Sequence, residues 1–268
     1  MIHNIIKDKS TRLFIMLGGF FIANALIAEV IGVKIFSLEK TLGITPFDIV
    51  LFGNHFSFNL TAGVLLWPVV FIMTDIINEY YGTRGVKILS YLTVALISYA
   101  FFMMFFAIHV IPADFWIGSG MQQGIPNMNI AFASIFGQGL WIIIGSLVAF
   151  LVGQLVDVLV FHKIKIFTGE KSVWLRATGS TLISQFIDSY IVLFIAFYIG
   201  PQLSSGNPWS VSLVLAVGTG NYIYKFIMAI ILTPVIYFVE KIIENYLGKK
   251  LSHDMKLAAM GREEEVDK

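Results

Sequence analysis

The sequence predicts an all-α integral membrane protein, a bundle of six transmembrane helices with both termini in the cytoplasm. Hydrophobic residues make up 57% of the chain and charged residues 13%, whereas soluble domains are about a quarter charged. The apolar residues fall in runs, and a helix needs about 20 consecutive apolar residues to cross a bilayer. A single transmembrane domain over residues 1–268 therefore accounts for the chain.

Windows of bilayer length place the six spans in order along the sequence. The spans cover residues 13–33, 60–80, 86–111, 130–160, 177–199 and 209–238. Lys7, Lys9 and Arg12 precede an apolar run that resembles a secretory signal, but the run continues to Val33, as a first span requires. The fourth and sixth spans, at about 30 residues or roughly 45 Å, must tilt, kink or project from the hydrocarbon.

The connections between the spans differ sharply in Lys and Arg content, and short basic loops stay in the cytoplasm. The connection between the first and second spans has Lys34 and Lys40, and residues 112–129 and 200–208 have no Lys or Arg. Apart from Lys225 inside the sixth span, the remaining basic residues lie at the termini and in or beside the other connections. This alternation predicts an even number of spans, both ends inside a bacterial-type inner membrane, and a cytoplasmic tail at residues 249–268.

Residues 35–58 form the longest external connection, with alternating apolar residues around Phe47 to Phe52. Alternation and turn residues are typical of a hairpin. The sequence thus predicts either a short hairpin or a re-entrant segment between the first two spans.

Several classes of function are excluded by what the chain lacks. A net charge of +1 gives no electrostatic support for a nucleic-acid partner, and there is no cysteine for disulfides or thiolate metal sites. No H-E-x-x-H, G-x-S-x-G or Walker sequence is present. We therefore expect no enzyme activity, catalytic residue, cofactor or metal site.

Polar residues near the midpoints of the spans predict a substrate site, because buried polar groups in a bilayer are costly and need partners. Asp188 and Lys225 are its charged members, and the alternative interpretation is a structural ion pair between two helices. Glu29 is an entry ligand or proton carrier, or alternatively pairs with Lys34. Pro68, near the middle of the second span, predicts a kink at this level. The candidate site residues are Asn24, Glu29, Gln185, Asp188, Asn221 and Lys225.

A second polar set lies at the cytoplasmic ends of the spans. Opposite charges gathered at one end of a bundle suit a gate that opens and closes by exchanging ion pairs, although static interfacial salt bridges would have the same pattern. The candidate gate or coupling residues are Asp75, Asn78, Glu79, Gln154, Asp157 and Arg176.

Small and aromatic residues add two further expectations. Gly145, Ala149 and Gly153 repeat at intervals of four, which predicts close helix packing. Trp67 and Trp141 lie at depths where a planar ligand could stack, as does Tyr222.

Four strings resemble the queuosine precursor transporter family: residues 25–34, 74–82, 153–157 and 174–188. Most specific is the combination of D-I-I-N-E-x-x-G from Asp75 with R-x-x-x-S-T-x-x-S-Q-x-x-D from Arg176. The external segment at residues 35–58 is longer than in compact members of the family.

The resemblance implies import of 7-deazaguanine bases, with 7-cyano-7-deazaguanine and 7-aminomethyl-7-deazaguanine as cargo. A carboxylate such as Asp188 would accept the N–H donors of the base, and aromatic rings would stack on its face. The alternatives are a substrate-binding membrane subunit of an ATP-driven vitamin or nucleobase importer, and a passive channel. The expected partners are this small molecule and the lipid bilayer, with no nucleic acid and no obligate partner subunit. The sequence leaves the energy source and homo-oligomerisation open.

Overall fold

In the computed structural model of the chain, which describes residues 8–137, 139–168 and 173–260, long apolar helices dominate the fold. Five helical stretches are long and apolar enough to cross a membrane, which confirms the all-α membrane class. They cover Lys9–Ile31, Trp67–His109, Met128–Thr168, Leu175–Leu203 and Val211–Leu247. This count is five rather than the predicted six, because the second and third predicted spans both fall in the helix Trp67–His109.

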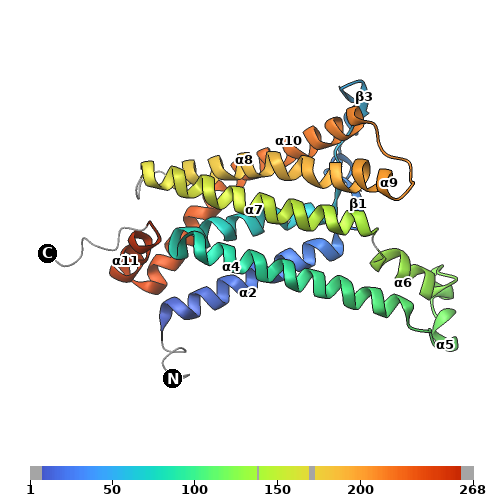
Figure 1. The fold of residues 1–268 in the computed structure, drawn as a ribbon, viewed down its shortest axis with the longest axis horizontal. Helices are drawn as coiled ribbons and strands as arrows, with labels where there is room; N and C mark the ends of the chain where they lie inside the picture. The colour runs from blue at the N-terminus through green and yellow to red at the C-terminus, as the bar shows by residue number, and fades with distance from the viewer. Residues whose placement is uncertain (1–7, 138, 169–172, 261–268) are drawn as a thin grey trace.

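The helices lie side by side along the long axis of the molecule (Figure 1). The start of α2 and the whole of α11 lie at one end, here called the α11 end, and the strands, α5 and α9 lie toward the other, the hairpin end. The helices are α2 (Lys9–Ile31), α4 (Trp67–His109), α5 (Asp114–Ile117), α6 (Met128–Phe136), α7 (Leu140–Thr168), α8 (Val173–Leu193), the π-helical η3 (Phe194–Ile199), α9 (Gly200–Leu203), α10 (Val211–Leu247) and α11 (Lys249–Ala259), with 3₁₀ turns η1 (Ala62–Leu65) and η2 (Met121–Gln123).

Helix α4 is interrupted at Gly82, whose φ of 64° and ψ of −171° are not helical. Only glycine adopts this backbone conformation without strain. A Cβ added to Gly82 would lie 3.2 Å from the carbonyl oxygen of Ala259 in α11. Both ends of α4 lie away from α11, while Gly82 touches it, so the chain reverses direction at this glycine. The break lies where the sequence predicts the connection between the second and third spans.

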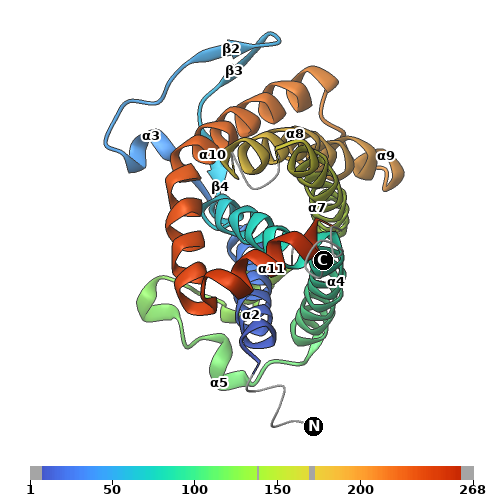
Figure 2. The ribbon, with the colours of Figure 1, turned by 90° about the vertical axis from the view of Figure 1, so that its left-hand side faces the viewer.

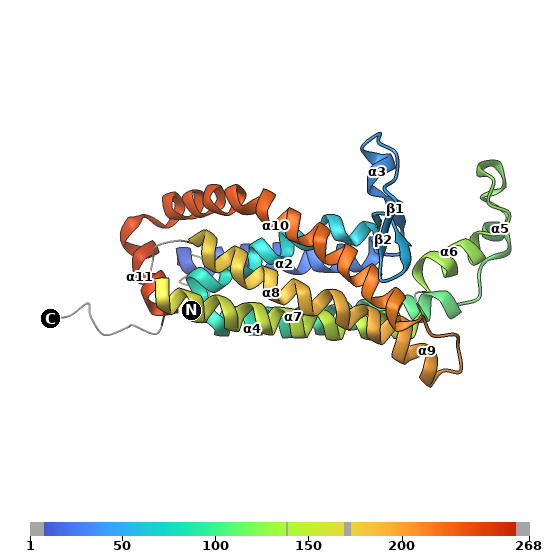
Figure 3. The same cartoon turned by 90° about the horizontal axis from the view of Figure 1, so that it is seen from above.

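Pro68 does not kink the middle of a helix, so that prediction was wrong. Helix α4 begins at Trp67, which places Pro68 in its first turn, where a missing N–H costs little. The preceding residues, predicted as the start of the span, form strand β4 (Asn59–Thr61) and the turn η1. Pro234 instead lies inside α10, and Figure 3 shows α10 changing direction along its length.

The connection after α2 contains the hairpin that was one of the two predicted alternatives. Strand β2 (Ile49–Leu51) pairs antiparallel with β3 (Asn54–Phe56), across a turn in which Phe52 and Gly53 both have positive φ. Below it, β1 (Ile35–Ser37) pairs with β4, so the two ends of the segment meet.

Glu39 links the two ends of the connection at residues 35–58 through a hydrogen bond. It lies in the short helix α3 (Leu38–Thr41), is 1% exposed, and accepts a 2.7 Å hydrogen bond from the backbone N–H of Phe58. Burial alone would raise the pKa of its carboxyl group, but the bonds from Phe58 and Ser37 lower it below the usual value. The carboxylate therefore stays ionised and fixes α3 to the strand region.

Close packing of α7 on α8 confirms the role predicted for the small residues. A Cβ on Gly145 would lie 3.0 Å from the carbonyl oxygen of Val192, and Ala149 is 1% exposed. A Cβ on Gly153 would lie 3.4 Å from the Cβ of Asp188. The backbones of α7 and α8 can approach each other because α7 has only Gly or Ala at these three contact positions.

Helix α11 occupies the first part of the predicted tail; residues 261–268 of that tail lie outside the described residues. Figure 2, which faces the α11 end, shows α11 lying across the bundle. Lys256 anchors it, with ion pairs of 2.5 Å to Glu240 and 2.9 Å to Glu244 of α10. Its ammonium group also lies 5.3 Å from the ring centroid of Tyr80.

Candidate functional site

A pocket opens between α4, α8 and α10, and it holds about 430 Å³ of atom-free space, including the part open to the surface. Each helix contributes residues at helical spacing, so that one face of each helix is turned to the pocket. The lining residues are Trp67, Pro68, Phe71, Ile72 and Asp75 from α4, Ala177, Thr178, Thr181 and Gln185 from α8, and Lys225, Ala229, Leu232 and Ile236 from α10.

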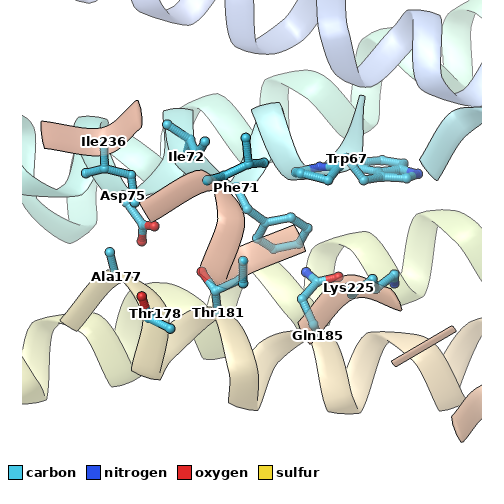
Figure 4. A pocket seen from close by; sticks show the side chains of 13 residues that line it. Trp67, Phe71, Ile72, Asp75, Ala177, Thr178, Thr181, Gln185, Lys225 and Ile236 are labelled. Carbon is cyan, nitrogen blue, oxygen red and sulfur yellow. The ribbon is translucent and has the colours of Figure 1, made fainter. Parts of the chain in front are cut away.

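Aromatic rings and polar groups lie opposite each other in this pocket. In Figure 4 the rings of Trp67 and Phe71 on α4 lie across from Thr181 and Gln185 on α8, and Asp75 lies toward the other end. Most of the remaining wall is aliphatic. An apolar cleft with a few convergent polar groups suits a small, flat ligand that carries hydrogen-bonding groups at its edge.

Gln185 is the polar residue of the pocket whose hydrogen-bonding capacity is entirely unused. Its side chain is 2% exposed, and neither its amide oxygen nor its amide nitrogen has a hydrogen-bond partner among the described residues. A buried amide without partners costs about 1 to 3 kcal/mol. A ligand that supplies one donor and one acceptor would remove this cost.

Lys225 and Asp188 form a direct ion pair, as the sequence suggested. Their side chains are 12% and 17% exposed, and only Lys225 lines the pocket. Asp188 lies behind it, against Gly153 of α7. The Lys225 side chain therefore reaches the pocket wall while Asp188 balances its charge.

The other predicted site residues lie away from the pocket wall. Glu29 is buried and accepts a hydrogen bond from the hydroxyl of Ser146. The Asp188 carboxylate is close enough to interact electrostatically with it. Asn24 donates a 2.8 Å hydrogen bond to the Phe20 carbonyl of its own helix. Asn221 is half-buried and is not a lining residue.

At the α11 end, Glu79 is the centre of a buried ion cluster. Arg176 of α8 lies 2.7 Å from one carboxylate oxygen of Glu79, and Lys165 of α7 lies 3.3 Å from the other. Lys165 also donates a 2.7 Å hydrogen bond to the Glu79 carbonyl. Lys165 was not predicted as part of this cluster, because hydropathy ends the span at residue 160 and places the lysine in a loop, whereas α7 continues to Thr168.

The remaining predicted gate residues lie in the same layer. Ser184 donates to a carboxylate oxygen of Asp157 at 3.0 Å rather than to Asp188, its near neighbour in sequence. Gln154 accepts a 2.8 Å bond from Thr74, and Asn78 donates to the Val158 carbonyl at 3.3 Å. Asp75 lies in this layer and also lines the pocket.

A second cavity of about 240 Å³ continues from the pocket toward the α11 end. Asp75 and Ile236 line both spaces and therefore lie at the boundary between them. The lining residues of the second cavity are Asp75, Ile76, Glu79, Tyr80, Phe161, Ile236 and Glu240.

Phe71 and Thr181 line the pocket although neither was among the predicted site residues, and their spacing could have revealed them. Phe71 lies four residues from both Trp67 and Asp75 on one helix face, and Thr181 lies four residues before Gln185.

Among the described residues, no group of three or more His, Cys, Asp and Glu side chains could hold a metal ion.

The family that these features point to is decided by comparison with known proteins. Residues 61–239, which include the pocket and the ion cluster, match the family described as "Putative vitamin uptake transporter". The chain belongs to this family. It is accordingly a membrane transport protein with several spanning helices, and not an enzyme.

Three relatives carry more specific names. The chain is 31% identical to a "Probable queuosine precursor transporter" of Bacillus subtilis over 71% of this chain and 76% of the relative. It is 26% identical to a protein of the same name in Haemophilus influenzae, over 92% and 93%. It is also 26% identical to the "Queuosine precursor transporter" of Escherichia coli, over 76% and 81%. No solved structure matches the chain.

The two motifs that resemble this family are in contact in the structure. Glu79 in the α4 motif pairs with Arg176, the first residue of the α8 motif. Asp75 and Gln185, one from each motif, line the same pocket. The sequence resemblance thus falls on residues that form one connected site.

Proposed function

We propose that the protein imports queuosine precursors across the bacterial inner membrane, with 7-cyano-7-deazaguanine and 7-aminomethyl-7-deazaguanine as cargo. The observation that carries this proposal is the unused amide of Gln185, which faces two aromatic rings across the pocket. The names of the three relatives support the same class of cargo.

The pocket chemistry fits a deazaguanine edge group by group. The Gln185 amide can donate to a ring carbonyl and accept from a ring N–H at the same time. The Lys225 ammonium can donate to a carbonyl, and the Asp75 carboxylate can accept from N–H donors. Trp67 and Phe71 can pack on the flat face of the base. Glu29, behind the Asp188 pair, is our candidate partner for an aminomethyl cation.

Transport requires that the site open alternately to the two sides of the membrane. We infer that α4 crosses the membrane twice, with its reversal at Gly82 on the cytoplasmic side, which gives six spans. The abundance of Lys and Arg at the α11 end supports this orientation. In this arrangement the Glu79 cluster with Arg176 and Lys165 serves as the cytoplasmic gate, and we propose that the protein acts without a partner subunit.

Uptake of labelled 7-cyano-7-deazaguanine into liposomes containing the purified protein alone tests the proposal. We expect saturable uptake that unlabelled deazaguanine inhibits and that vitamins do not. Uptake that appears only when a co-purified ATPase is added would show an ATP-driven importer subunit instead. Non-saturable uptake would indicate a passive channel.

The variant Gln185→Leu tests the site itself, with Ser189→Ala as the matched control. Ser189 is also buried and its hydroxyl also has no partner within the described part of the chain, but it is not a lining residue. We expect Gln185→Leu to weaken binding at least tenfold without loss of thermal stability, and Ser189→Ala to leave binding unchanged. Unchanged binding by Gln185→Leu would contradict the proposed site.

A further inference from the structure

The ion cluster at the α11 end contains more buried carboxyl groups than cations. Asp75, Glu79 and Asp157 are each at most 3% exposed, and so are Lys165 and Arg176. Both cations pair with Glu79. With three carboxylates and two cations, one negative charge would remain if every group were ionised.

Among the described residues, the hydrogen-bond partners near the carboxyl group of Asp157 are all neutral. Ser184 donates to one oxygen, the hydroxyls of Ser180 and Thr181 also face the group, and its second oxygen has no partner among the described residues. A buried carboxylate without a cation is strongly disfavoured relative to the neutral acid.

Asp75 is the neighbouring carboxyl group and interacts electrostatically with Asp157. One of its oxygens is also buried without a partner among the residues described. Arg176 and Glu79 act on Asp75 with opposite charges. Two buried carboxyl groups that interact are costly to ionise together, so the pair favours a state in which one of them holds a proton.

The other charged groups near this pair have partners of their own among the described residues. On α10, Lys225 pairs with Asp188, and Glu240, which lines the second cavity with Asp75, shares Lys256 of α11 with Glu244. Lys225 and Lys256 are thus held by other carboxylates, and neither forms an ion pair with Asp75 or Asp157 in the part of the chain that the structure describes.

Asp75 is also the group of this pair that reaches both open spaces, since it lines the pocket and the second cavity. A proton on Asp75 can therefore exchange with the pocket on one side and with the cavity toward α11 on the other. A protonated Asp75 keeps a carboxyl oxygen that can accept an N–H of a bound base, so the site can hold the proton and the base together.

We propose that Asp75 and Asp157 form a proton-binding site that couples substrate import to proton entry. The inference rests on the proposed transport function. The O–H bond forms with a proton from water on the pocket side, and it breaks when that proton passes to water in the second cavity. Substrate and proton then cross in the same direction, and the pair returns without either.

Proteoliposomes loaded with a pH-sensitive dye test this proposal with labelled 7-cyano-7-deazaguanine. For one proton per neutral substrate, an inward-directed gradient of one pH unit should give about tenfold accumulation. Substrate addition should also acidify the interior. Wild-type accumulation that follows a Na⁺ gradient and ignores the pH gradient would overturn the proposal.

The variant Asp157→Asn resembles the permanently protonated acid and keeps an oxygen that can accept from Ser184. We expect it to lose both gradient-driven accumulation and substrate-induced acidification, but to keep exchange of external labelled for internal unlabelled substrate. Asp114→Asn, an exposed carboxyl group on α5, is the matched control and should behave as wild type. Retained acidification by Asp157→Asn would overturn the proposal.

Two further measurements keep the outcomes distinct. If Asp157→Asn does not fold, Asp75→Asn is tested for the same loss of substrate-induced acidification, and retained acidification there also overturns the proposal. If the wild type exchanges the labelled base but shows no response to pH, only proton coupling fails. If the wild type neither binds nor exchanges the base, the proposed cargo fails.

Discussion

The ring of Phe56 on the hairpin rests directly on Gly220 of α10. A Cβ added at Gly220 would lie 1.8 Å from the ring Cζ, so no larger residue fits while Phe56 keeps its place. The contact lies about one and a half turns from Lys225 and holds β3 against the helix that lines the pocket. The missing side chain of Gly220 thus leaves room on α10 for the Phe56 ring, and this contact holds the hairpin.

We expect Gly220→Leu to displace the hairpin and Phe56→Ala to restore its position in the double variant. The chain has no cysteine, so a single Leu60→Cys substitution can report on the nearby segment. Leu60 is 2% exposed, and a maleimide should label the cysteine faster in Gly220→Leu than in the parent. Equal labelling rates in the two proteins would show that the contact does not hold the hairpin.

The ion pair of Asp188 and Lys225 predicts a large cost for either single change. Asp188→Asn leaves a mostly buried ammonium group without its partner, which should lower the free energy of unfolding by about 3 kcal/mol. The double variant Asp188→Asn, Lys225→Met should recover most of this loss, as measured by thermal unfolding in detergent.

Uptake by the double variant separates the two interpretations of the pair. If Lys225 contacts substrate, the stable double variant should still lose uptake of labelled deazaguanine. Recovery of uptake together with stability would show that the pair is structural only.

The contact of Lys256 with α10 predicts stable attachment of α11 across the physiological pH range. Burial tends to lower the pKa of this lysine, but the bonds to Glu240 and Glu244 outweigh it and raise the pKa above its usual value. Its folded pKa thus exceeds the unfolded one. The stabilisation is therefore complete below the ordinary lysine pKa of about 10.4, and it is lost as the pH rises through the folded pKa.

Hydrogen exchange of residues 249–259 measures this attachment. Exchange should rise in Lys256→Met at neutral pH and stay low in Lys256→Arg, which keeps the charge. If α11 is equally protected in Lys256→Met, its packing rather than the ion pairs holds it.

The backbone at Gly82 predicts a local sensitivity to substitution. Gly82→Ala forces a side chain into a conformation that is essentially limited to glycine and places a methyl group 3.2 Å from the Ala259 carbonyl oxygen. We expect a loss of about 1 to 3 kcal/mol in unfolding free energy. Gly19→Ala on α2, where a Cβ meets no atom within 4 Å, is the control and should not destabilise the protein. Equal thermal unfolding of the two variants would contradict this account.

The sequence predicted the membrane class because apolar run length depends only on composition along the chain. It failed at Pro68, because hydropathy does not distinguish a strand and a 3₁₀ turn from the first turns of an apolar helix. It also failed at Lys165, because the aliphatic stem and charge of a lysine look the same in a loop and in a buried ion cluster.

Which residues line the pocket was harder to predict than how deep each residue lies in the membrane. Lys225 and Gln185 line the pocket, and their binding of substrate stays a prediction. Asn24 and Asn221, at similar predicted depth, lie elsewhere, because depth does not determine which way a helix face turns. Asp75 was assigned to the gate, and its place at the pocket depends on how α4 packs against α8 and α10.

Helix α10 acts on both ends of the molecule at once. It contacts the hairpin at Gly220 and α11 at Glu240, and Pro234 lies between these two contacts. A proline inside a helix removes one backbone hydrogen bond, so α10 can bend at Pro234. The part of α10 that holds the hairpin could then move without shifting the part that holds α11, and one end of the bundle could open while the other stays closed.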